Sequence, residues 1–276
     1  MTKKLKEIYS QSLIYVDEIN VSKIDIEYLI KETFSLTNLD FILKQDEIFD
    51  DALINKRIEE LREGKPVEYI LGYASFCLMN FKVNENTLIP RSETEDLVYR
   101  VLDLIDNLKI ENPRILDIGS GSGCIPITLN KKIKGSIVES VDISSKALEV
   151  AKINNELNDT FVKFYLSDCF ENVEGTFDII ISNPPYIDRD TYVQESVLKY
   201  EPHSALFADN KGLAIYEKII KELSSYVKKH SLVAFEISPD LVSRLEALIK
   251  KHLSDCSYYF EKDLNGFERF LFIIFK

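Results

Sequence analysis

The sequence has few residues that suit a metal site or a disulfide framework. Its 276 residues include four cysteines, Cys77, Cys124, Cys169 and Cys256, and only three histidines. No two cysteines stand at the short spacing of zinc-binding pairs, and their wide separation gives no disulfide pattern. We therefore expect four reduced thiols, most of them buried, and no metal.

Long apolar segments are also absent. No stretch approaches the roughly 18–20 consecutive apolar residues that a membrane span needs. The first ten residues, MTKKLKEIYS, do not lead into the apolar core of a signal peptide. Internal repeats and low-complexity segments are missing as well. These absences predict a cytoplasmic globular protein that does not bind membranes.

Positive charge is scarce. Lys and Arg number 34 against 46 Asp and Glu, which gives a net charge of −12. An acidic surface repels phosphate backbones, so we expect no stable binding of nucleic acid. Hydrophobic residues make up 45%, enough for a substantial core, and the length predicts one large domain plus a smaller one.

The first part of the chain carries helical patterns. One helix is expected directly after Ser22, and a second over 46–62, before the break at Gly64-Lys65-Pro66. We interpret residues 1–72 as a small helical domain, suited to a lid or to protein docking. Residues 73–89 predict a β-hairpin that links it to the rest of the chain.

Strand and helix patterns alternate over residues 90–276. Helices are expected at 145–157 and 213–227, and strands at 114–118, 136–142, 162–167, 177–182, 232–237, 257–261 and 267–275. This alternation predicts an α/β domain with a mostly parallel sheet and helices on both faces. The last two strands follow each other through a short turn, so they should form an antiparallel hairpin.

A glycine-rich turn follows the first of these strands. It is Asp117-Ile118-Gly119-Ser120-Gly121-Ser122-Gly123, whose glycines allow close approach of a ligand. The spacing does not fit the G-x-G-x-x-G turn of dinucleotide sites, and the Lys-Ser/Thr pair of a P-loop is missing. Asp117 disfavours a phosphate ligand and favours one with a positively charged amine.

Two further acids end the next two strands. Asp142 stands where an acid can bind both hydroxyls of a ribose. Asp168, in Ser167-Asp168-Cys169-Phe170, can accept a hydrogen bond from an exocyclic amine, with Phe170 covering the base. Amine, ribose and adenine sites in this order predict S-adenosylmethionine as the cofactor.

The loop Asn183-Pro184-Pro185-Tyr186 follows the fourth strand. The two prolines cannot continue a strand and offer carbonyl acceptors without N–H donors. Together with the side-chain oxygen of Asn183, such acceptors can bind both hydrogens of a planar NH2 group, against which Tyr186 can lie flat. This arrangement favours methylation of an amide or arylamine nitrogen.

These motifs resemble those of a known class of enzymes. The loop at 183–186 and the turn at 117–123 are similar to those of amino-methyltransferases with a seven-stranded Rossmann-like sheet. Three further segments, Pro66–Gly72, Thr87–Glu95 and Tyr200–Pro202, resemble the peptide-chain release factor N5-glutamine methyltransferases (the HemK/PrmC family). The resemblance runs from about residue 5 to the C-terminus.

The resemblance implies a function in translation termination. Family members transfer a methyl group from S-adenosylmethionine to the side-chain amide nitrogen of the glutamine in the GGQ loop of release factors. It implies that the cofactor is lined by Gly119, Ser120, Gly121, Ser122, Gly123, Asp142, Asp168 and Cys169, with Asp117 and Phe170 added from the patterns above. It implies that Asn183, Pro184, Pro185 and Tyr186 hold the glutamine, with Asn183, Pro184 and Tyr186 as the catalytic residues and Asn183 also binding the cofactor. It further implies that residues 1–72 recognise the substrate.

Several alternatives remain open on the sequence alone. The substrate could instead be a ribosomal-protein glutamine or an exocyclic amine on a nucleic-acid base, which an aromatic loop serves equally well. The chain could also be a binding module without activity. Either Cys169 or Phe170 could contact adenine. Ser92 and Glu95 fit a helix capping box, with Arg91 or Thr94 near the site.

Overall fold

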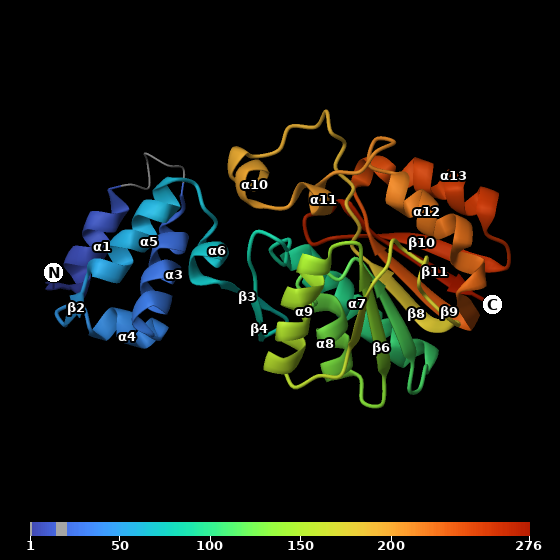
Figure 1. Ribbon diagram of the computed structural model, residues 1–276, viewed down its shortest axis with the longest axis horizontal. Helices are drawn as coiled ribbons and strands as arrows, with labels where there is room; N and C mark the ends of the chain where they lie inside the picture. The colour runs from blue at the N-terminus through green and yellow to red at the C-terminus, as the bar shows by residue number, and fades with distance from the viewer. Residues whose placement is uncertain (1, 15–20) are drawn as a thin grey trace. The chain divides into compact units, whose positions relative to one another are not determined.

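The structure, a computed structural model, describes residues 2–14 and 21–276 (Figure 1). The chain forms two compact units. The smaller contains the described residues up to Tyr73 together with Glu195–Tyr200, and the larger contains Ala74–Gln194 and Glu201–Lys276. Among the described helices, none is long and apolar enough to cross a membrane.

The smaller unit is mainly helical. Its elements are β1 (Thr2–Lys4), α1 (Leu5–Leu13), α3 (Lys23–Phe34), α4 (Asn38–Leu43), β2 (Ile48–Asp50), α5 (Ala52–Arg62), α6 (Val67–Leu71) and α10 (Glu195–Tyr200). Helix α3 begins where the sequence predicts it, because Ser22 and Asp25 cap it reciprocally, with Ser22 Oγ accepting from the Asp25 N–H at 3.1 Å. Buried apolar residues of α1, α3, α5 and α6 share one core.

The predicted helix over 46–62 is wrong in its first turns. Residues Ile48–Asp50 form β2, which pairs antiparallel with β1, and helix α5 starts only at Ala52. Ile48 is exposed instead of contributing to a helical stripe. The pairing joins segments about 46 residues apart, so the local periodicity of the sequence does not reveal it.

The larger unit contains an open α/β sheet. Its strands and helices are β3 (Tyr73–Phe76), whose first residue falls in the smaller unit, β4 (Met79–Lys82), α7 (Ser92–Leu108), β5 (Arg114–Ile118), α8 (Cys124–Lys132), β6 (Ile137–Asp142), α9 (Ser145–Leu157), β7 (Lys163–Leu166), β8 (Phe177–Ser182), α11 (His203–Leu206), α12 (Ala214–Glu222), β9 (Val227–Glu236), α13 (Val242–His252), β10 (Cys256–Lys262) and β11 (Glu268–Phe275). Short 3₁₀ turns at Leu223–Ser225 and Pro239–Leu241 flank β9. The predicted helix over 213–227 thus ends early, and β9 begins at Val227.

The seven-stranded sheet has the order β10-β11-β9-β8-β5-β6-β7. Strand β11 is antiparallel to both of its neighbours, whereas β9, β8, β5, β6 and β7 pair in parallel. This confirms the predicted mostly parallel sheet with a C-terminal antiparallel hairpin. Side chains of β8 are buried on both faces, as expected for a central parallel strand.

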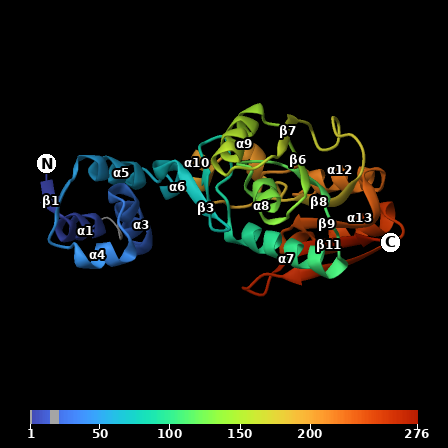
Figure 2. The ribbon, with the colours of Figure 1, turned by 90° about the horizontal axis from the view of Figure 1, so that it is seen from below.

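Helices cover both faces of the sheet (Figures 1 and 2). One apolar cluster joins α7, α8 and α9 to one face, and a second joins α12 and α13 to the other. The hairpin β3–β4 contributes Phe76 and Phe81 to the first cluster, so most of it packs within the larger unit. The carboxyl ends of β5, β6 and β8 lie at one edge of the sheet, where open α/β sheets bind ligands.

Candidate active site

The glycine-rich turn connects β5 to α8. Its three glycines have positive φ angles, +92° at Gly119, +51° at Gly121 and +82° at Gly123. A β-carbon on Gly123 would lie 2.9 Å from the side chain of Ile127, so this position needs glycine for space as well as for backbone conformation. Gly119 and Gly121 line a pocket at the carboxyl ends of the strands. Gly123 is the N-cap residue of α8 and does not line this pocket.

Asp117 is buried beneath this turn and does not line the pocket. Its Oδ2 accepts a hydrogen bond from Ser140 Oγ at 2.6 Å, and Ser140 in turn lies 2.6 Å from Ser120 Oγ. Burial raises the pKa of Asp117 to about 7. Within the described residues its Oδ1 has no hydrogen-bond partner.

Asp142 ends β6 and lines the pocket directly. Its two oxygens accept backbone hydrogen bonds, from Gly121 N–H at 2.9 Å and from Ser144 N–H at 2.8 Å. These bonds fix the carboxylate across the glycine-rich turn. Burial raises the pKa of Asp142, although the backbone donors partly oppose this. The structure therefore brings the turn and the second acid together as the sequence predicts.

Asp168 and Cys169 also line the pocket, but Phe170 does not. Asp168 Oδ2 forms an ion pair with Lys218 Nζ at 2.7 Å, so one of its oxygens is already engaged. Phe170 is buried in the core and stacks on Tyr226, with ring centroids 4.1 Å apart. The expectation that Phe170 covers the base from inside the pocket is therefore wrong, because the apolar core satisfies its ring.

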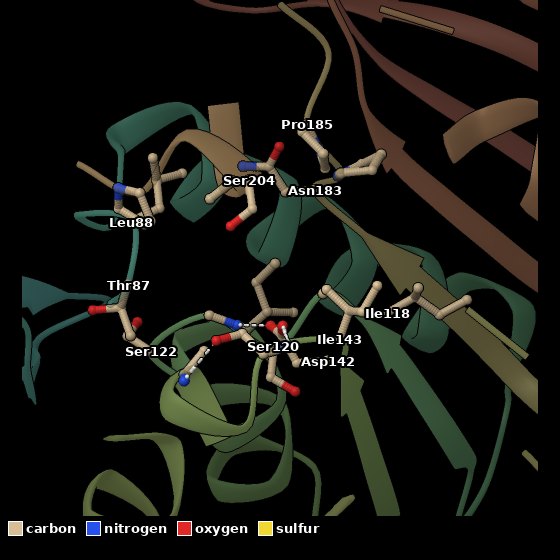
Figure 3. A pocket seen from close by; sticks show the side chains of 18 of the residues that line it. Thr87, Leu88, Ile118, Ser120, Ser122, Asp142, Ile143, Asn183, Pro185 and Ser204 are labelled. Atoms are coloured by element: carbon tan, nitrogen blue, oxygen red, sulfur yellow. Dashed lines mark hydrogen bonds between the residues drawn. The ribbon is translucent and has the colours of Figure 1, made fainter. Parts of the chain in front are cut away.

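Asn183, Pro184 and Pro185 line the pocket from the loop after β8. Figure 3 shows Asn183 and Pro185 on one side of the pocket, with Asp142 and Ser120 on the other. Tyr186 is not a lining residue. It is partly buried, and its hydroxyl donates to Glu236 Oε1 at 3.4 Å. The structure thus places three residues of the predicted loop at the pocket and turns the fourth away from it.

A segment preceding α7 completes the wall. Thr87, Leu88, Pro90 and Arg91 line the pocket together with Pro202, Ser204 and Ala205, which lie about 110 residues further along the chain. Glu201 joins these two stretches. Its Oε2 accepts from the Ile89 N–H at 3.1 Å, and its Oε1 accepts from the Arg91 guanidinium. The buried Glu201 side chain thus holds together two of the motifs singled out in the sequence.

The predicted capping box at the start of α7 does not form. Arg91 is the cap position, without a side-chain capping bond, and the Glu95 carboxylate instead accepts from the Cys77 N–H at 2.9 Å. Thr94, offered as an alternative, does line the pocket. Sequence reasoning missed Glu236, a buried acid at the end of an apolar strand. Its position at the end of a strand resembles the positions of Asp142 and Asp168, and this likeness could have identified Glu236 as a candidate site residue.

The fold and the pocket define a methyltransferase class. Residues 101–200 match the family described as "Methyltransferase small domain". Among solved structures, a methyltransferase from Pyrococcus furiosus superimposes with a TM-score of 0.54 at 18% identity, over 80% of this chain and 98% of that one. A 16S rRNA N2 G1207 methyltransferase from T. thermophilus, in complex with AdoMet and guanosine, gives 0.56 at 14% identity, over 74% and 50%. At these identities the likeness concerns the fold.

Sequence relatives narrow the class. The chain is 37% identical over 251 residues to a release factor glutamine methyltransferase from Staphylococcus aureus, covering 88% of this chain and 89% of the relative. It is 35% identical over 277 residues to a protein of the same name from Streptococcus pneumoniae, covering 98% of each. The chain belongs to the release factor glutamine methyltransferase family, as its motifs predict.

Proposed function

We propose that this protein methylates the side-chain amide nitrogen of the GGQ glutamine in peptide chain release factors, with S-adenosylmethionine as the donor. The observation that carries the proposal is the placement of Asn183 in the same pocket as the glycine-rich turn and Asp142. This placement supports adjacent sites for a planar amide and for a methyl donor. Membership of the family over most of the chain supports the same substrate.

The residues present fit the donor. The fixed carboxylate of Asp142 suits the ribose and Asp168 with Cys169 suits the adenine, whereas Asp117 lies beneath the turn and does not line the pocket. When bound, S-adenosylmethionine supplies a methyl group on a positively charged sulfur. The acidic side chains of this pocket favour such a cation, and the apolar members of its wall keep water from the reacting atoms.

The loop at 183–186 positions the substrate amide. An amide nitrogen is a weak nucleophile because its lone pair is delocalised into the carbonyl. Asn183 Oδ1 and the carbonyl of Pro184 are acceptors that can bind the two N–H bonds of the substrate amide. Such bonds hold the nitrogen in line for displacement and stabilise the positive charge that develops on it. We infer that the smaller helical unit contributes to recognition of the protein substrate.

The test uses purified full-length protein, radiolabelled S-adenosylmethionine and a recombinant release factor. We expect label in the release factor, and none in a variant whose GGQ motif is changed to GGN. Asn183→Ala should lose the transfer while still binding the donor. Label that appears only in ribosomal proteins or RNA would overturn the substrate and leave the reaction class. No label in any of these would point to a binding module.

A further inference from the structure

A chain of buried side chains runs from the pocket wall into the core. Asn183 Nδ2 donates to Thr94 Oγ1 at 3.0 Å, and Thr94 Oγ1 donates to Glu236 Oε2 at 2.6 Å. Thr94 lies in the first turn of α7 and Glu236 is the last residue of β9. Both are almost completely buried, at 3% and 2% exposure. Three elements distant in sequence therefore meet in one hydrogen-bond path.

Counting protons along this path fixes the orientation of the Asn183 amide. An ionised Glu236 has no proton to give, so the single hydroxyl proton of Thr94 must point to it. Thr94 Oγ1 is then only an acceptor towards Asn183 and requires the NH2 group of the amide. The carbonyl oxygen of Asn183 consequently lies on the opposite side, and it accepts no hydrogen bond from the other described residues.

We propose that Thr94 and Glu236 are positioning residues that hold the Asn183 amide with its oxygen presented to the NH2 group of the substrate. This inference rests on the proposed function, because only an NH2 substrate needs an acceptor there. A turned amide would present its own NH2 group and repel the substrate. Neither Thr94 nor Glu236 needs to touch the reacting atoms.

The surroundings of Glu236 make its ionisation sensitive to pH. Burial raises the pKa of Glu236 to about 7 and Glu93 also raises it, whereas the hydrogen bond from Thr94, the charge of Arg269 and the Tyr186 hydroxyl lower it. Tyr216 donates to the Glu236 backbone carbonyl at 2.6 Å and keeps the strand end in place. When Glu236 is protonated it can donate a proton itself, and the path no longer dictates which way the amide points. Orientation should therefore weaken as pH falls through about 7.

The matched variants are Thr94→Val, which removes the hydroxyl, and Thr94→Ser, which keeps it. We expect Thr94→Val to lower kcat on release factor by about tenfold to a hundredfold, which corresponds to the loss of one buried hydrogen bond that orients the Asn183 amide. KM for the release factor and the calorimetric Kd for S-adenosylmethionine should stay within about twofold of the wild-type values, a change much smaller than that expected for kcat. Thr94→Ser should recover most of the lost kcat.

A second readout does not depend on activity. The side-chain amide protons of Asn183, identified by NMR through their loss in Asn183→Ala, should exchange with solvent more slowly in wild type and Thr94→Ser than in Thr94→Val. If Thr94→Val does not fold, Glu236→Gln takes its place. At saturating substrates, wild-type kcat should fall as pH drops through about 7, and Glu236→Gln should remove that step.

The outcomes separate the two claims. If wild type labels the release factor but Thr94→Val and Thr94→Ser have the same kcat and the same amide-proton exchange, the positioning role of Thr94 and Glu236 is overturned. The same holds if Glu236→Gln keeps the pH step. If the Asn183 amide protons exchange more slowly in wild type than in Thr94→Val but wild type labels no release factor, the positioning role of Thr94 and Glu236 is supported and the proposed function fails.

Discussion

Two glycines of the same turn provide a sharp test of how the site is built. Gly121→Ala and Gly123→Ala each place an L-residue at positive φ, which costs about 1–2 kcal/mol. They differ in the space available. A β-carbon at Gly121 meets nothing within 4 Å, whereas one at Gly123 lies 2.9 Å from Ile127 Cδ1, 3.1 Å from Ala151 Cβ and 3.3 Å from Phe164 Cζ.

The steric difference predicts the energetic one. Ile127 can rotate its terminal methyl away, but the Ala151 Cβ is fixed to the backbone of α9, so α9 and the start of α8 must move apart by a few tenths of an ångström. Overpacking of this kind adds about 1–3 kcal/mol. We therefore expect Gly123→Ala to lose about 2–5 kcal/mol of unfolding free energy and Gly121→Ala only about 1–2. Urea unfolding followed by circular dichroism measures both, and equal midpoints for the two variants would refute the reasoning.

Three further predictions concern acidic side chains. Asp142→Ala leaves the Ser144 N–H without its carboxylate and removes the proposed ribose acceptor, so calorimetry should show S-adenosylmethionine binding weakened by about tenfold or more. Burial raises the pKa of Asp117 from 3.8 to about 7, so its contribution to stability is present below pH 4 and is lost as the pH rises through about 7. The urea midpoint of the wild type should therefore fall between pH 5 and 8. The midpoint of Asp117→Asn should fall less steeply over the same range. An unchanged slope would contradict this. Glu201→Ala leaves the Arg91 guanidinium without its buried partner, so the free energy of unfolding should fall by about 1–3 kcal/mol and the thermal midpoint should drop. An unchanged midpoint would contradict the conclusion that Glu201 holds the two segments together.

The sequence predicts the parts of this molecule that local patterns determine. Helix α9 and strands β5 and β8 have the predicted bounds, because a cap residue or a continuous apolar run marks their ends. The turn glycines and Asp142 are recognisable because their chemistry follows strand ends. The resemblance of the motifs to the release factor glutamine methyltransferases is confirmed by the relatives.

What the sequence does not predict depends on contacts between distant segments. Strand β2 exists because β1 pairs with it. Phe170 points into the core because Tyr226, 56 residues away, offers a stacking partner. The bond between Thr94 and Glu236 spans 142 residues, and no local pattern relates the two. Glu95 fits a capping box in sequence, yet the Cys77 backbone competes successfully for its carboxylate.

The central claim, methyl transfer to an amide nitrogen held by Asn183, is tested most directly by locating the methyl group. The release factor is incubated with the protein and S-adenosylmethionine carrying a deuterated methyl group, and the peptide containing the GGQ loop is fragmented in a mass spectrometer. We predict that the fragments place one deuterated methyl on the glutamine side chain, and that Asn183→Ala yields none. A methyl found on any other residue of the release factor, or an unmodified glutamine in the presence of active protein, would contradict the account.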